Sequence, residues 1–177
     1  RYIGVTGVQT CALPISDGDA VVLHPGDVRV GTRGERLTTL LGSCVAILLS
    51  DPRGTVGAMC HVVHPGRTVP PARCDTTRLH DAMAAMDAAL TELGMRASLC
   101  RAWVAGGGNH FPRRCPDGSE GDIGAANVRA ALALLAAMGI PVDGQSLRGA
   151  CYRKVDWTIG QVPRIEVVGI APEEILA

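Results

Sequence analysis

Residues 40–63 read LLGSCVAILLSDPRGTVGAMCHVV, two apolar runs on either side of a turn sequence. The first run continues without interruption from Cys44 to Leu49, which is typical of a strand buried on both faces. The second run extends from Thr55 to Val63, and Asp51-Pro52-Arg53-Gly54 between them is a strong turn signal. This stretch predicts an antiparallel hairpin in the core of the protein.

Further strands are predicted on both sides of the hairpin. Residues 20–30 favour two short strands around the turn at 24–27, and residues 98–105 favour a strand that runs into three glycines at 106–108. The runs 150–157 and 162–168 predict two more strands, joined near Gly160.

Two segments have the apolar period of a helix instead. The first carries a stripe of five apolar residues, with Asp75 or Thr76 as its N-cap and Gly94 at its end. Its members are Leu79, Met83, Met86, Leu90 and Leu93. The second covers residues 125–138, with Val128, Leu132, Leu135 and Met138 facing inward. The elements together predict an α/β fold of the α+β kind, a layered sandwich of mixed, largely antiparallel sheets with two main helices.

Composition limits the classes of protein that remain. The chain has 177 residues, of which 47% are hydrophobic and 19% charged, which suits one globular domain. Seventeen basic residues balance seventeen acidic ones without a long basic run, so no nucleic-acid partner is expected. No apolar run approaches the ~20 residues that span a bilayer, so no membrane insertion is expected. Residues 1–16 resemble the translation of a sequencing adapter, which leaves residues 17–177 as the expected single domain.

Six cysteines lie outside that leader, and no two of them form a CxxC pair. A zinc ribbon or a thioredoxin-type motif is therefore not expected, and the thiols are expected to be reduced, as in the cytoplasm. Cys60, His61, His64 and Cys74 form a loose cluster, but their spacing does not match a zinc site. We expect no metal and no cofactor.

Cys44 and His61 are the candidate nucleophile and base. A cysteine becomes nucleophilic as its thiolate, which a neighbouring histidine can generate. The two residues are nearly equidistant from the turn of the hairpin, so we expect them almost directly opposite each other. Gly42 and Ser43 precede the cysteine, and backbone N–H groups there are candidate oxyanion donors. The competing interpretation is that Cys44 is an inert core cysteine, while alternation points Cys60 away from His61.

Two motifs resemble the chemoreceptor glutamine deamidase family, CheD: residues 38–46, TTLLGSCVA, and residues 57–61, GAMCH. Shorter pieces follow in the family's order at 81–83, 105–107, 123–127 and 153–155. The resemblance implies a Thr–His–Cys catalytic set at Thr38, His61 and Cys44. Thr39 is one position off and is expected to face the other way.

The resemblance also implies the function. It implies a cytoplasmic hydrolase that converts glutamine side chains on chemoreceptor helices to glutamate, with a CheC-type phosphatase as a further partner. Two alternatives stay open: a thiol amidase that acts on a small amide, and a non-catalytic chemotaxis protein that regulates such a phosphatase.

Overall fold

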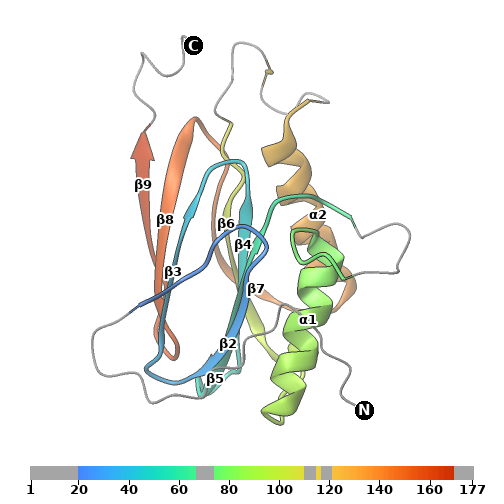
Figure 1. Cartoon of the computed structure of the whole chain (residues 1–177), viewed down its shortest axis with the longest axis vertical. Coiled ribbons are helices and arrows are strands. Elements are labelled where there is room, and N and C mark those ends of the chain that lie inside the picture. Colours follow the sequence, from blue (N-terminus) through green and yellow to red (C-terminus); the bar gives the residue numbers. More distant parts are fainter. Residues whose placement is uncertain (1–19, 67–73, 110–114, 117–120, 170–177) are drawn as a thin grey trace.

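The computed structural model describes residues 20–66, 74–109, 115–116 and 121–169, so the leader at 1–16 lies outside it. Three layers make up the molecule: a four-stranded sheet, a five-stranded sheet and a pair of helices (Figure 1). This is the α+β layered sandwich that the sequence predicts. Among the described residues, no helix has both the length and the apolar character needed to cross a membrane.

The five-stranded sheet forms the central layer and contains the predicted hairpin. Its order is β2-β5-β4-β6-β7, and only the β6–β7 pair is parallel. The strands are β2 (Val28–Thr32), β5 (Val56–Val62), β4 (Val45–Ser50), β6 (Arg101–Gly106) and β7 (Val142–Leu147). β6 starts later than predicted because residues 97–99 form a 3₁₀ turn.

The four-stranded sheet forms an outer layer in the order β1-β3-β8-β9. Its strands are β1 (Val21–Val22), β3 (Arg36–Leu41), β8 (Cys151–Thr158) and β9 (Arg164–Gly169). β3 pairs with β8 in antiparallel register, and β1 pairs with β3 in parallel register. No covering layer packs on the outer side of this sheet in the described part of the chain (Figure 1).

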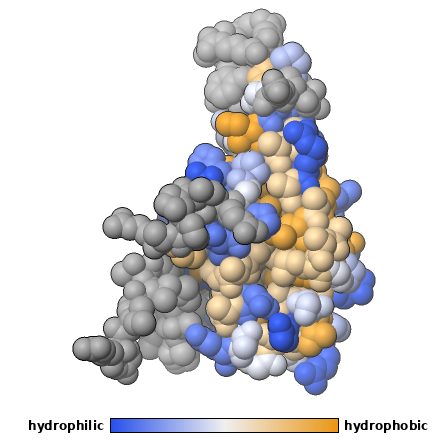
Figure 2. Space-filling view, turned by 90° about the vertical axis from the view of Figure 1, so that its right-hand side faces the viewer, coloured by the Kyte–Doolittle hydropathy of each residue, from blue (hydrophilic) through white to orange (hydrophobic). Residues whose placement is uncertain are grey.

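Helices α1 (Leu79–Glu92) and α2 (Ile123–Ala137) cover the other face of the five-stranded sheet (Figure 1). The predicted cap of α1 is wrong: its N-cap is Arg78, which makes no side-chain cap bond, because the Asp75 carboxylate accepts from the Thr77 N–H and hydroxyl instead. α2 begins two residues earlier than predicted because the Asp122 carboxylate accepts from the Ala125 N–H. Figure 2 shows this helical face, where weakly hydrophobic atoms extend across the centre.

Alternation along the strands divides the core into two clusters. Val45, Ile47 and Leu49 of β4 pack toward the helices, whereas Ala46 and Leu48 face the four-stranded sheet. The same alternation sends Cys60 of β5 toward the helices and Met59 toward the four-stranded sheet. A side chain on β4 or β5 therefore faces either the helices or the four-stranded sheet. Odd-numbered residues of β4 and even-numbered residues of β5 face the helices, and the others face the four-stranded sheet.

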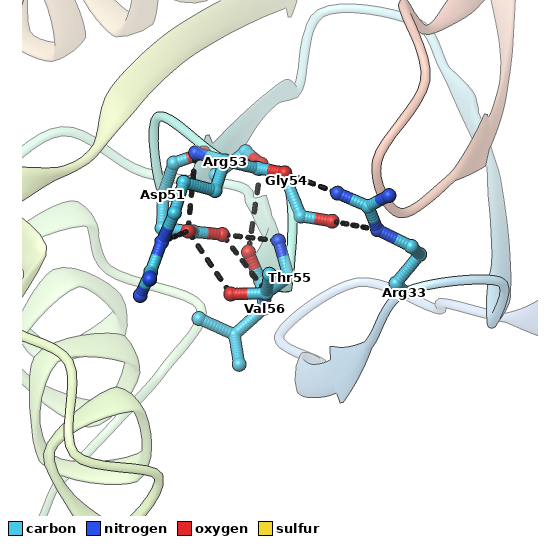
Figure 3. A network of polar contacts seen from close by, with 7 residues as sticks. Arg33, Asp51, Arg53, Gly54, Thr55 and Val56 are labelled. Carbon is cyan, nitrogen blue, oxygen red and sulfur yellow. Dashed lines mark hydrogen bonds and ion pairs between the residues drawn. The ribbon is translucent and has the colours of Figure 1, made fainter.

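The turn of the hairpin is held by one buried carboxylate. Asp51 accepts hydrogen bonds from the N–H groups of Arg53, Thr55 and Val56 and from the Thr55 hydroxyl (Figure 3). Arg33 reaches the same loop from outside the hairpin and donates to the Gly54 carbonyl at 3.0 Å. These bonds hold the turn between β4 and β5 in one geometry, which fixes the register of the two strands.

Candidate active site between the two sheets

The register of the hairpin sets where Cys44 and His61 lie. Ala46 is the residue opposite His61, and the last pair of the ladder is Val45 with Val62. Continuing this register places Cys44 opposite Val63, so the expectation that Cys44 and His61 are directly opposite is wrong by two residues. They are offset diagonally across the end of the hairpin, where the ladder stops at Val45 and Val62.

Both side chains nevertheless face the same space. Cys44 packs at the edge of the cluster between the sheets, on the side of β4 that carries Ala46 and Leu48. His61 shares the side of β5 that carries Met59, which belongs to that same cluster. His61 is only 3% exposed, whereas Cys44 is partly exposed. Of the two residues, Cys44 is therefore the more accessible to solvent.

The threonine that contacts His61 is Thr39, not Thr38. Thr39 Oγ1 lies 2.9 Å from His61 Nδ1, and the Thr39 side chain is 2% exposed. Thr38 donates its hydroxyl to the Val155 carbonyl at 2.7 Å instead. Thr38 does not contact His61 because Leu37 and Leu41 face the core between the sheets, and alternation along β3 places Thr39 on that face with them.

Hydrogen bonds around Thr39 assign the proton on the imidazole. Thr39 Oγ1 donates to the Leu23 carbonyl at 2.8 Å, so its single proton is used there. The hydroxyl oxygen must then accept from His61, which places the ring proton on Nδ1. Nε2 is left unprotonated, and it is buried without a hydrogen-bond partner among the described residues. That nitrogen is the atom a general base needs free.

Burial keeps both groups neutral in the resting state. Desolvation lowers the pKa of His61 below its ordinary value, against the opposing effects of the Leu23 carbonyl and Asp27. Desolvation also raises the pKa of the Cys44 thiol, against a smaller lowering by its own backbone N–H. The site therefore holds a thiol and a neutral imidazole, and an ion pair between them would form only when the proton is transferred.

The backbone from Gly42 to Cys44 is held by hydrogen bonds to its carbonyl groups. The carbonyls of Gly42, Ser43 and Cys44 accept from Gly108 N–H, Asn127 Nδ2 and Gly107 N–H at 2.8, 3.1 and 2.8 Å. Across the described residues, no backbone carbonyl outside the strand ladders accepts from the N–H groups of Ser43 and Cys44. These are the donors that the sequence suggested for an oxyanion.

Glycines allow this close approach. A Cβ atom at Gly106 would lie 2.1 Å from the Cys44 carbonyl oxygen, and φ there is +119°, which side chains rarely adopt. A Cβ atom at Gly108 would lie 3.2 Å from the Gly42 carbonyl oxygen. The glycine run at 106–108 therefore serves backbone packing against the cysteine segment.

A cavity of about 110 Å³ opens beside Ser43. Gly108, Asn109, Cys115, the buried N-cap residue Asp122 and the first residues of α2 line it. Neither Cys44 nor His61 lines this cavity, so it adjoins the site at the backbone of the cysteine segment.

The loose Cys/His cluster does not assemble. Cys60 packs under the helices, on the opposite side of β5 from His61. In the described residues, no group of three or more His, Cys, Asp or Glu side chains is arranged to hold a metal ion.

Comparison with known proteins identifies the family. The family model for CheD chemotactic sensory transduction matches residues 79–162. A probable chemoreceptor glutamine deamidase CheD 2 from Albidiferax ferrireducens is 36% identical over 76% of this chain and 79% of its own length. The chain belongs to the CheD family.

Other CheD relatives agree in identity and coverage. A probable chemoreceptor glutamine deamidase CheD from Pseudomonas fluorescens is 36% identical over 76% of both chains. A CheD 1 protein with the same description, from Chromobacterium violaceum, is 33% identical over 78% of this chain and 72% of its own. The similarity therefore extends well beyond the residues that the family model matches.

Two residues of the site were not found from the sequence. Thr39 could have been found by continuing the alternation back from Leu41, because every second residue of a half-buried strand shares a face. Asn127 lies in the motif at 123–127, but its two contacts lie 84 and 64 residues away along the chain, which no local pattern signals.

Proposed function

We propose that this protein is a glutamine deamidase that acts on chemoreceptors, with Cys44 as nucleophile and His61 as general base. The observation that carries the proposal is the imidazole held by Thr39 through Nδ1, with Nε2 unpartnered among the described residues and Cys44 packed against the same cluster between the sheets. The names of the CheD relatives support glutamine on chemoreceptors as the substrate.

The chemistry begins with acylation of the cysteine. Nε2 of His61 takes the thiol proton, and the Cys44 sulfur attacks the amide carbon of the glutamine side chain. The N–H groups of Ser43 and Cys44 would hold the developing oxyanion. His61 then returns the proton to the nitrogen, the C–N bond breaks, and ammonia leaves a thioester on Cys44.

Hydrolysis completes the cycle. His61 takes a proton from water, the hydroxide attacks the thioester carbon, and the C–S bond breaks as the proton returns to the sulfur. One glutamine and one water become one glutamate and one ammonia, and Cys44 is restored. No metal or cofactor takes part in these steps.

The proposed substrate is the cytoplasmic helical part of a chemoreceptor, so the proposed place of action is the cytoplasm. A CheC-type phosphatase is retained as a proposed partner on the strength of the family resemblance alone. Mixing the purified proteins and measuring a change in sedimentation would test that partner.

The proposal is tested by mass spectrometry of a purified receptor cytoplasmic fragment incubated with the full chain. Each conversion of glutamine to glutamate adds about one dalton, and peptide mapping locates it. We expect conversion by the wild type and none by Cys44→Ala or His61→Ala, both checked for folding by circular dichroism.

Other outcomes would favour the alternatives. Turnover of free glutamine without conversion of any receptor would favour a thiol amidase for a small amide. Folded wild type that converts neither across a panel of receptors would contradict the proposal and favour a non-catalytic regulator. Slow alkylation of Cys44 at neutral pH does not distinguish these cases, because its thiol has a raised pKa in either.

A further inference from the structure

One side chain of helix α2 contacts a residue beside the proposed nucleophile and a residue just beyond the strand that carries the proposed base. Asn127 Nδ2 donates to the Ser43 carbonyl at 3.1 Å and to the Val63 carbonyl at 2.9 Å. The side chain is 2% exposed. Both partners are carbonyl oxygens, so the NH₂ end of the amide must face them.

These two bonds continue the hairpin where its own ladder ends. The last backbone pair is Val45 with Val62, and the next pair would be Cys44 with Val63. The Val63 N–H instead bonds to the Thr77 carbonyl, so the two strands part at this point. The amide of Asn127 spans the opening between the two chain segments. Its two hydrogen bonds fix the distance between the Ser43 and Val63 carbonyls.

The bond to Ser43 also fixes the direction of a catalytic donor. The Ser43 carbonyl and the Cys44 N–H belong to one planar trans peptide, so they point in opposite directions. Holding the oxygen against Asn127 therefore turns the Cys44 N–H away from α2. The Gly108 N–H acts on the Gly42 carbonyl in the same way and orients the Ser43 N–H.

The N-terminal part of helix α2, which carries Asn127, is held in place by contacts of its own. Its first turn is capped by Asp122. A Cβ atom at Gly124 would lie 2.6 and 2.7 Å from the Gly107 and Gly108 carbonyl oxygens, so only glycine permits this contact. The helix and the glycine run thus approach the cysteine segment as one packed unit.

We propose that Asn127 is a positioning residue that orients the Cys44 N–H as an oxyanion donor. The inference rests on the proposed deamidase function. Asn127 touches neither the thiol nor the imidazole in this role, and it acts through the peptide between Ser43 and Cys44.

The test compares two reactions of the same sulfur. Deamidation passes through an oxyanion, whereas alkylation by iodoacetamide displaces iodide and forms none. For Asn127→Ala we expect kcat for deamidation of the receptor fragment to fall roughly 10- to 100-fold, with KM nearly unchanged. The alkylation rate of Cys44 should stay within about twofold of wild type, since that step needs no oxyanion donor.

Two further variants keep the test decisive. Asn127→Ser retains one hydroxyl donor in a smaller side chain, so it should fold and show an intermediate loss of kcat. Arg129→Ala removes an exposed side chain from the same helix and should match wild type in both reactions.

Each result has one meaning. Equal loss of deamidation and alkylation in Asn127→Ala would assign a merely structural role and overturn the inference. Unchanged kcat in folded Asn127→Ala or Asn127→Ser would overturn it while leaving the deamidase proposal intact. A wild type that deamidates nothing would overturn both.

Discussion

A threonine hydroxyl serves His61 differently from the carboxylate of a serine protease triad. A carboxylate orients the imidazole and also stabilises its charged form, whereas a neutral hydroxyl only orients it. This agrees with the lowered pKa of His61, whose largest cause is desolvation. The site therefore depends on geometry, and the identity of the orienting threonine matters.

Substitutions of Thr39 and of its neighbour Thr38 should have different effects on the rate of deamidation. In Thr39→Val the hydrogen bond to Nδ1 is lost, and we expect kcat for deamidation to fall roughly tenfold, the equivalent of about 1.4 kcal/mol. Thr38→Val, whose hydroxyl bonds to Val155, should stay within about twofold. Steady-state kinetics on the receptor fragment would show this, and a larger loss in Thr38→Val would contradict the assignment.

The two shifted pKa values predict a broad pH profile. The acid limb of kcat/KM should lie below pH 6.5, because His61 must be neutral and its pKa is lowered from that value. The alkaline limb should lie above pH 9.0, because the pKa of the Cys44 thiol is raised from that value. Initial rates between pH 5 and 10 would test this, and an acid limb above 6.5 would contradict the lowered pKa of His61.

At the scale of elements, the β4–β5 hairpin fixes the site from its far end. The turn at Asp51 is the point where both strands are held (Figure 3). The cysteine and histidine lie at the opposite end of the hairpin. Desolvation disfavours the ionised Asp51, but its hydrogen bonds together keep the pKa of Asp51 below the ordinary value. Removing a buried carboxylate leaves its hydrogen-bond donors unsatisfied, and this lowers the free energy of unfolding.

Asp51→Ala should destabilise the fold without acting on the chemistry. Three backbone N–H groups lose their acceptor, and we expect a loss of about 2–4 kcal/mol in the free energy of unfolding. Arg53→Ala is the matched control, because its side chain is 80% exposed and lies 3.8 Å from the same carboxylate. Urea unfolding measures both, and equal stabilities would contradict the role given to Asp51.

At the scale of the whole molecule, the site exists only because two sheets pack face to face. Thr39 comes from the four-stranded sheet and His61 from the five-stranded sheet. Their contact fixes the spacing of the layers on one side. Trp157 of β8 fills the space on the other side, where a Cβ atom at Gly57 would lie 2.5 Å from its ring.

Gly57→Ala should therefore force the layers apart. Overpacking of this kind costs typically 1–3 kcal/mol, and we expect a loss of that order in the free energy of unfolding. Gly169→Ala is the control, since no heavy atom lies within 4 Å of a Cβ atom there. Calorimetry would compare the two, and a Gly57→Ala protein as stable as the control would contradict the close packing.

The sequence by itself determined the elements whose signal is local. The hairpin, both helices and the layered class followed from apolar periodicity and turn residues, which depend on near neighbours only. Strand β7 was not predicted, because Asp143, Gly144, Gln145 and Ser146 give it no apolar pattern and its pairing with β6 is long-range. The cap of α1 was misplaced for a similar reason, since Asp75 bonds within its own turn.

The features of the candidate site also divide into those that the sequence predicts and those that only the tertiary structure decides. The candidate cysteine, histidine and glycine-serine backbone could be predicted, because chemistry restricts which residue types serve those roles. The diagonal register, the choice of Thr39 over Thr38 and the contacts of Asn127 were decided by tertiary structure. Each depends on which face of a strand meets another layer, and a shift of one residue reverses that face.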